Sequence, residues 1–161
     1  MICLRKQDGF SLIELIAVFS LMGILLLISW PAVKSWQKSA SYKEIARNIA
    51  LTLRDARARA VSSNLEHRVV FDVDGNQYQM DRGNLAYGST AWPTSFSQTA
   101  LPDFSSLKSG AGCNQDADVT LLFSPNGSCD SEPSICIMDS SGFRRYRVSI
   151  GSSVSARVVI D

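Results

Sequence analysis

The chain has 161 residues, of which 16 are Lys or Arg and 15 are Asp or Glu, so its formal net charge is +1. No global electrostatic field draws such a protein to nucleic acid or to acidic lipid, and any binding of that kind must come from a local patch. Once a separate apolar segment is set aside, this length allows one globular domain.

The first predicted element is an apolar helix over residues 10–33, preceded by the basic pair Arg5 and Lys6. As helix, this stretch spans about 36 Å, enough for the ~30 Å hydrocarbon core of a bilayer. Its one charged residue is Glu14, and a charge there costs roughly 2.5–3.5 kcal/mol, so such a residue is usually functional. A cleaved secretory signal is the alternative, but the run is too long and no small-x-small cleavage site follows Ile28.

Residues 9–15 read Gly-Phe-Ser-Leu-Ile-Glu-Leu, which closely resembles the processing site of type IV prepilins and type II secretion prepseudopilins. In that family a dedicated peptidase cuts after the glycine and methylates the new N-terminal phenylalanine. The resemblance implies a leader over residues 1–9, cleavage between Gly9 and Phe10, and N-methylation of Phe10. It also implies that Glu14 is an assembly residue, pairing with the α-amino group of Phe10 in the same or a neighbouring subunit.

The same resemblance implies a single-pass protein of the bacterial inner membrane with its C-terminal domain in the periplasm. Charge alone does not orient the helix, because the basic residues Arg5 and Lys6 precede it and three lysines follow it. Gly23 and Pro31 interrupt the apolar helix at costs of about 1 and 3 kcal/mol, which packing or kinking in a membrane explains. In type IV pilins, a glycine and a proline at matching places bracket a stretch that can lose helicity in the filament.

Residues 34–62 are predicted to continue this helix in amphipathic form. Apolar residues recur there at spacings of three and four, and the charged residues lie largely off that stripe. The stripe consists of Ile45, Ile49, Leu53, Ala56 and Ala60. We interpret the charged run 54–59 as a solvated helix face rather than a ligand site.

From Arg68 onward the apolar period falls to two, which predicts strands. Residues 69–73 and 77–80 indicate a β-hairpin around Gly75, and we favour this turn over a calcium loop because the closing glutamate is missing. Residues 83–118 are predicted to form a long irregular insert with at most a short strand, anchored by aromatic side chains. Four further strands, expected as an antiparallel meander, are residues 119–123, 134–138, 143–150 and 154–160.

The C-terminal pattern resembles the pseudopilin H and FimT group, minor subunits of type II secretion pseudopili and type IV pili. Three segments carry this resemblance. They are an apolar strand that leads into Ser-Pro-Asn-Gly at 124–127, a second apolar strand at 135–138, and Arg-Val-Ser at 147–149. The expected fold class is α+β, a long N-terminal helix packed on an antiparallel β-sheet domain. The expected segments are 1–9, 10–33, 34–62 and 63–161.

Three cysteines remain once Cys3 departs with the leader: Cys113, Cys129 and Cys136. An exported domain meets an oxidising compartment, so one disulfide and one free thiol are expected. Of the three pairings we favour Cys129–Cys136, whose short loop enters a strand, although the sequence does not choose. Three thiols with no nearby histidine do not complete a zinc site.

Enzymatic interpretations have little support. His67 is the one histidine, and no nucleophile motif, Walker loop or dinucleotide glycine pattern accompanies it. We expect no catalytic residue, cofactor or metal. The sequence indicates a minor pilin or pseudopilin subunit for protein secretion. Its partners would be other (pseudo)pilins, the prepilin peptidase and the inner-membrane assembly platform.

Two alternatives stay open: an unprocessed single-pass membrane protein, and a DNA-binding minor pilin for natural transformation. DNA-binding members of the FimT group carry a C-terminal Gly-Arg-x-Arg, and here the corresponding place keeps one arginine, Arg157. Arg145 and Arg147 are further candidates for DNA contact. Strand alternation predicts that these two share a face and that Arg144 points to the other.

Co-expression with a prepilin peptidase is expected to remove nine residues and leave N-methylated Phe10. Gly9→Val should block cleavage because the site requires a small residue, whereas Gly9→Ala serves as the tolerated control. Intact-mass spectrometry of membrane-extracted protein measures both outcomes. Retention of residues 1–9 in the presence of active peptidase would contradict the prepilin interpretation.

Overall fold

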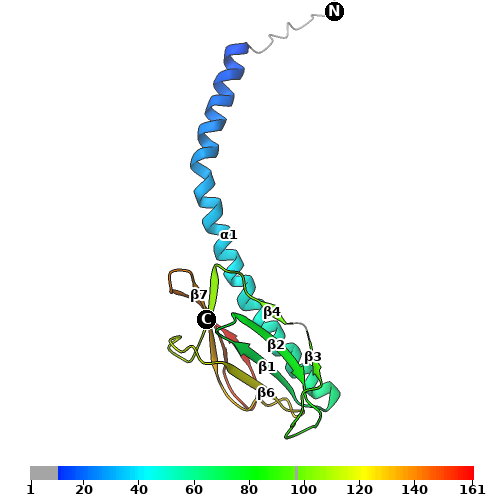
Figure 1. Cartoon of the computed structure of the whole chain (residues 1–161). Helices are drawn as coiled ribbons and strands as arrows, with labels where there is room; N and C mark the ends of the chain where they lie inside the picture. The colour runs from blue at the N-terminus through cyan, green and yellow to red at the C-terminus, as the bar shows by residue number, and fades with distance from the viewer. Residues whose placement is uncertain (1–10, 97) are drawn as a thin grey trace, which may run out of the picture. The chain divides into compact units, whose positions relative to one another are not determined.

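The structure is a computed structural model that describes residues 11–96 and 98–161; for residues 27–35 it describes the helical backbone but not the side chains. α1 (Leu12–Ser63) is one continuous helix of 52 residues (Figure 1). It ends where Asn64 adopts a left-handed φ of 53°, a common way to terminate a helix. The predicted continuous helix ending near residue 62 is confirmed over this range, while Phe10 lies outside the described residues.

The chain divides into two units, Met1–Ala40 and Ser41–Asp161. In the first unit the side chains of residues 11–26 are all exposed. Among the residues that the structure describes, no helix is both long and apolar enough to cross a membrane. The predicted span over residues 10–33 includes Phe10 and the side chains of residues 27–33, which lie outside the described residues.

In the second unit, α1 buries one face. The predicted apolar stripe is confirmed at Ile49, Leu53, Ala56 and Ala60, and Ile45 is partly buried against the same core. Tyr42, Ala46 and Ala50 extend the buried face. The small alanine side chains let strands approach the helix closely, because packing distance depends on the side chains at the contact.

The first sheet contains five strands: β1 (His67–Asp72), β2 (Gln77–Arg82), β3 (Thr94–Ser95), β4 (Thr99–Ala100) and β6 (Val119–Phe123). Its order is β3-β2-β1-β6, with β4 also pairing with β2, and each pairing is antiparallel. Along β1 buried and half-buried residues alternate, so that Val69 and Phe71 face the core.

The predicted hairpin is confirmed by the pairing of β1 with β2, in which Asp72 lies opposite Gln77. The Asp72 carboxylate accepts hydrogen bonds from Gly75 N–H at 2.6 Å and from the Gln77 side chain at 2.7 Å. These two bonds lower the pKa of Asp72. Both carboxylate oxygens therefore serve the turn, as the turn interpretation expects.

The second sheet has the order β5-β7-β8-β9, again with antiparallel pairing. Its strands are β5 (Ser105–Ser109), β7 (Ser134–Asp139), β8 (Arg144–Ile150) and β9 (Val158–Ile160). β9 begins four residues after the predicted start at residue 154, because residues 151–157 form a turn. In that turn Gly151 N–H donates to the Arg157 carbonyl.

The expectation of a meander over the last four strands is wrong at its first member. β6 pairs with β1 in the first sheet and not with β7, and only β7, β8 and β9 follow one another as neighbours. Residues 124–133 connect β6 to β7 and are too long for the two- to five-residue loop of a tight hairpin. The edge position beside β7 is taken by β5. The expectation of at most a short strand in the insert over residues 83–118 is wrong, because β3, β4 and β5 all lie in it.

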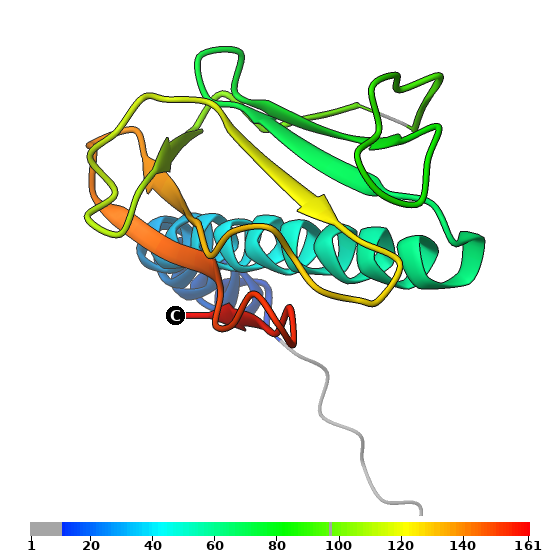
Figure 2. The same cartoon turned by 90° about the horizontal axis from the view of Figure 1, so that it is seen from below.

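Both sheets and the second-unit part of α1 share one hydrophobic core. Figure 2 shows this part of the helix running along one side of the strands of both sheets. Core side chains from the sheets include Phe71 of β1, Phe123 of β6, Ile137 of β7 and Val148 of β8. The α+β class, a long helix packed on antiparallel sheets, is therefore confirmed.

Aromatic side chains anchor the segment between β2 and β6, as predicted. The Tyr42 hydroxyl donates to the Phe104 carbonyl at 2.9 Å, and the two rings meet edge to face. The Arg68 guanidinium lies 4.3 Å from the centre of the Trp92 ring. The Glu66 carboxylate adds a polar anchor by accepting the backbone N–H groups of Gly88 and Ser89.

The favoured cysteine pairing is wrong. Cys113 and Cys136 form the disulfide, and Cys129 is a buried free thiol whose pKa burial raises to about 11. Pairing depends on whether two Cα atoms come within reach of each other. Here β5 pairs with β7, which brings the turn after β5 beside Cys136. The short distance in sequence between Cys129 and Cys136 did not show which cysteine would lie beside Cys136 in the fold.

Cys113→Ser and Cys136→Ser are expected to lower the free energy of unfolding by about 3 kcal/mol, because the cross-link spans 23 residues. Cys129→Ser should keep the disulfide and serves as the control. Peptide mapping under non-reducing conditions identifies the pair, and urea unfolding measures the loss. A cross-linked peptide that contains Cys129 would contradict the assignment.

Candidate functional site

Glu14 lies near the start of α1 on an exposed, otherwise apolar helix face. Together with Leu15, Val18, Phe19 and Met22 it lines a shallow groove of about 290 Å³. Its carboxylate has no hydrogen-bond or ion-pair partner in the part of the chain that the structure describes. An anionic group flanked by apolar side chains is suited to receive a cation from another molecule or from the chain terminus.

The other residues predicted near the N-terminus are Gly9, Phe10, Gly23 and Pro31. Gly9 and Phe10 lie outside the described residues. The backbone of α1 is helical at positions 23 and 31, and a Cβ at Gly23 would meet open space beyond the adjacent backbone of its own helix. The side chain of Pro31 lies outside the description. A loss of helicity between these two positions stays a prediction.

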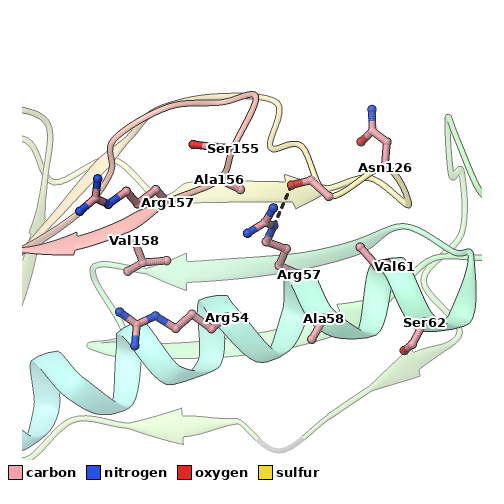
Figure 3. Close-up of a pocket in the computed structure, with 11 residues that line it drawn as sticks. Arg54, Arg57, Ala58, Val61, Ser62, Asn126, Ser155, Ala156, Arg157 and Val158 are labelled. Carbon is pink, nitrogen blue, oxygen red and sulfur yellow. Dashed lines mark hydrogen bonds between the residues drawn. The ribbon is translucent and has the colours of Figure 1, made fainter.

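A cleft of about 910 Å³ lies within the second unit, between α1 and two loops (Figure 3). Arg54 and Arg57 reach it from α1, and Arg157 reaches it from the loop before β9. Its remaining lining is small, apolar or neutral: Ala58, Val61, Ser62, Asn126, Gly127, Ser155, Ala156 and Val158. The cleft therefore has three guanidinium groups and no carboxylate in its lining.

Arg57 joins the helix to the loop after β6. Its Nε donates to the Gly127 carbonyl at 2.9 Å (dashed line in Figure 3). Gly127 has a φ of +81°, and a Cβ there would lie 3.3 Å from an Arg57 terminal nitrogen and 3.5 Å from Val61. Glycine is suited to this position because it adopts positive φ without strain and leaves room for the guanidinium.

The interpretation of residues 54–59 as a solvated face is therefore incomplete. Arg59 agrees with this interpretation, because it forms an exposed ion pair with Asp55 at 2.7 Å. Arg54 and Arg57 instead line the cleft. Their spacing of three places them on one edge of the helix. The sequence contained that spacing, but it did not show which loops would cover the edge.

The arginines predicted as DNA contacts are not gathered in one place. Arg145 pairs with the buried carboxylate of Asp139 at 2.7 Å, and Arg147 pairs with Asp161 at 2.6 Å. Arg157 lines the cleft. The predicted division of faces is also wrong for β8, because its register with β7 shifts next to Arg145.

This register shift changes which side chains share a face. Arg144 lies opposite Met138 and Arg147 lies opposite Cys136, and residues directly opposite each other share a face of the sheet. Met138 and Cys136 are two residues apart and so also share a face. Arg144 and Arg147 therefore lie together, and Arg145 is the extra residue of a β-bulge.

The bulged hairpin is held by Asp139. Its carboxylate accepts hydrogen bonds from the backbone N–H groups of Phe143 and Ser141, each at 2.9 Å, and from the Arg145 side chain. These bonds, first that of Phe143, lower the pKa of Asp139 against the opposing effect of burial. Arg145 is thus committed to a structural contact within its own hairpin.

His67 has a packing role in the structure. It is buried in β1, its ring stacks on Phe96 at 6.1 Å, and its Nδ1 lies 3.1 Å from the Leu65 carbonyl. Burial lowers the pKa of its imidazole. In the part of the chain that the structure describes, no group of three or more His, Cys, Asp or Glu side chains is placed to hold a metal ion.

Comparison with known families supports the N-terminal assignment. Residues 4–30 match a family model described as the prokaryotic N-terminal methylation motif. A search of curated proteins finds no match. The chain thus carries a prepilin-type N-terminus over the segment that contains Gly9, Phe10 and Glu14.

Solved structures with a similar fold are pilin-like. The minor pseudopilin EpsH from the type 2 secretion system of Vibrio cholerae matches in two structures. One has a TM-score of 0.57, 17% identity, and coverage of 75% of this chain and 96% of EpsH. The other has a TM-score of 0.59, 15% identity, and coverage of 76% and 97%. A structure of the type IV minor pilin FimU from Pseudomonas aeruginosa matches with a TM-score of 0.54 and 19% identity. The match covers 78% of this chain and 92% of FimU. The chain has a type IV pilin-like fold of the minor pseudopilin kind.

Gly127→Ala is expected to destabilise the protein more than Gly142→Ala. Both glycines have positive φ, +81° and +77°, but only Gly127 has neighbours within 4 Å. Each substitution costs about 1–2 kcal/mol in backbone strain, and weakening of the Arg57–Gly127 hydrogen bond adds roughly 0.5–1.5 kcal/mol. Urea unfolding of the full chain in neutral detergent measures the difference. Equal losses would contradict a structural role for the Arg57 contact.

Proposed function

We propose that this chain is a minor subunit of a pilus or pseudopilus that a prepilin peptidase processes. The observation that supports this most directly is the combination, in one chain, of a methylation motif over residues 4–30 with a minor pseudopilin fold. Neither feature alone defines a filament subunit. Together they match its two parts, an N-terminal assembly helix and an external domain.

In this proposal the peptidase cuts between Gly9 and Phe10 and methylates Phe10. Cleavage exposes a new α-amino group one helical turn from Glu14. The leader takes Arg5, Lys6 and Asp8 with it, so the mature chain is formally neutral. The charges that remain at the N-terminus are then the amine and the Glu14 carboxylate, which attract each other.

The exposed apolar face of α1 explains why this pairing sets a register. Leu12 and Phe19 are 77% and 64% exposed, and such a surface requires cover by lipid or by neighbouring helices. Apolar packing alone does not fix how far one helix slides along another. A single ion pair between Glu14 of one subunit and Phe10 of the next would fix it, because an unpaired charge in apolar surroundings is strongly unfavourable.

The proposed location is the bacterial inner membrane, with the second unit in the periplasm. The Cys113–Cys136 disulfide supports this location, because disulfides form and persist in oxidising compartments. The proposed partners are other (pseudo)pilins, the prepilin peptidase and an inner-membrane assembly platform. We propose a role in initiating or assembling the filament for protein secretion.

The similarity to both EpsH and FimU leaves the choice between a secretion pseudopilus and a type IV pilus to experiment. DNA binding for transformation has less support. Two of its three candidate arginines, Arg145 and Arg147, are in ion pairs within the domain. Contacts to phosphate would have to compete with those pairs.

Glu14→Gln is expected to leave membrane insertion and cleavage intact, because removing a charge from an apolar helix favours insertion. Its incorporation into filaments should fall at least about tenfold, since the loss of a paired buried charge costs several kcal/mol. Sheared filaments from cells that express the other subunits are quantified by immunoblotting.

Glu44→Gln is the matched control, because Glu44 is an exposed glutamate of the same helix in the second unit. It should assemble like the parent chain. If Glu14→Gln also assembles like the parent, the register mechanism is wrong. If the processed parent chain never enters filaments, the proposed function itself is wrong.

A further inference from the structure

We infer that the cleft lined by Arg54, Arg57 and Arg157 is a docking site for an acidic segment of a neighbouring filament subunit. This inference rests on the proposed function for the identity of its partner. The carboxylate-binding chemistry of the cleft rests on the structure alone. We refer to the site as the arginine cleft.

The first argument is that these arginines gather in one cleft without a carboxylate partner. Four of the seven other arginines of the second unit are matched to carboxylates, whereas Arg47, Arg82 and Arg144 have no such partner among the described residues. The pairs are Arg59–Asp55, Arg68–Asp81, Arg145–Asp139 and Arg147–Asp161. Among the described residues, none of the three arginines of the arginine cleft has an acidic partner.

The second argument is the state of their donors. Within the described part of the chain, Arg54 and Arg157 donate no side-chain hydrogen bond, and Arg57 uses only its Nε, toward the Gly127 carbonyl. Anchoring at Nε holds the Arg57 guanidinium in place and leaves both terminal nitrogens able to donate. A guanidinium in this state is prepared for a bidentate contact with a carboxylate.

The third argument is electrostatic. The mature chain is formally neutral, so the positive charge of the arginine cleft is local and not part of a general excess. A concave site lined by charges of one sign focuses the field and raises the local concentration of counter-ions. The three guanidinium groups also repel one another, and an anionic occupant would relieve that repulsion.

The shape and walls of the arginine cleft favour a peptide as the occupant. Its volume of about 910 Å³ falls within the range of ligand sites, about 300–1,000 Å³, and suits a few residues of extended chain. Ala58, Val61 and Val158 provide apolar wall, which complements aliphatic side chains between the carboxylates. Duplex DNA presents its phosphates on a wide convex surface, and a concave site of this size matches it poorly.

The direct test is to titrate a peptide into the full processed chain in neutral detergent and to measure its binding by isothermal titration calorimetry. The probe is an acetylated, amidated peptide with the repeat Glu-Val-Glu-Ala, and its control has Gln in place of every Glu. We expect the acidic peptide to bind and the neutral one not to bind. Binding should weaken as salt rises toward 1 M, where the Debye length is about 3 Å.

The variants are Arg54→Gln and Arg157→Gln, which remove charge without removing the Arg57–Gly127 anchor. Each single variant should raise the dissociation constant of the acidic peptide about fivefold. The double variant should raise it about twenty-fivefold if the two arginines act independently. Arg47→Gln is the control, because Arg47 is an exposed arginine of the same helix that does not line the cleft. It should bind like the parent.

Two results would overturn the inference. One is equal binding by the parent and the double variant. The other is tighter, equally arginine-dependent binding of a short DNA duplex, which would make nucleic acid the occupant.

Filament incorporation provides a separate readout. The double variant should be processed normally but incorporated less than the parent, whereas Arg47→Gln should be incorporated fully. Peptide binding with normal incorporation of the double variant would overturn the assignment of the neighbouring subunit as partner. Failure of the parent chain itself to be incorporated would overturn the proposed function, while the peptide titration would still decide whether the cleft binds carboxylates.

Discussion

The burial of one face of α1 against two separate sheets is the contact on which the second unit depends. The inner faces of the two sheets do not pack only against each other, because both sheets share a single core with the helix. Ile49 and Leu53 fill that core, and Ala46, Ala56 and Ala60 allow strands to approach the helix. A helix that alternated large and small residues differently would separate the sheets and open the core to water.

The same contact creates the arginine cleft. Because α1 lies along the sheets, its edge residues Arg54 and Arg57 meet the loop after β6 and the loop before β9. Gly127 lets the first loop approach the helix, and its carbonyl fixes Arg57. Packing that stabilises the fold thus also determines which charges are left without internal partners.

The two units differ in what they require from other molecules. The second unit buries a hydrophobic core of its own between α1 and the strands, whereas the described side chains of residues 11–26 are all exposed. In the proposed function, Glu14 is the charged group of that surface whose pairing distinguishes one helix alignment from another. Assembly through the first unit and recognition through the second would then be separate physical tasks, carried out by different residues.

The sequence by itself determined the features that depend on local periodicity: the end of α1 near residue 62, its buried stripe, the hairpin of β1 and β2, and the motif at residues 4–30. The tertiary structure decided the partner of β6, the cysteine that joins Cys136, and the faces of Arg144 and Arg147. The first two depend on which distant strands pair, and the third depends on the register shift within the β7–β8 hairpin. Alternation within one strand contains no information on its neighbour, and a single bulge reverses the faces of the residues on either side.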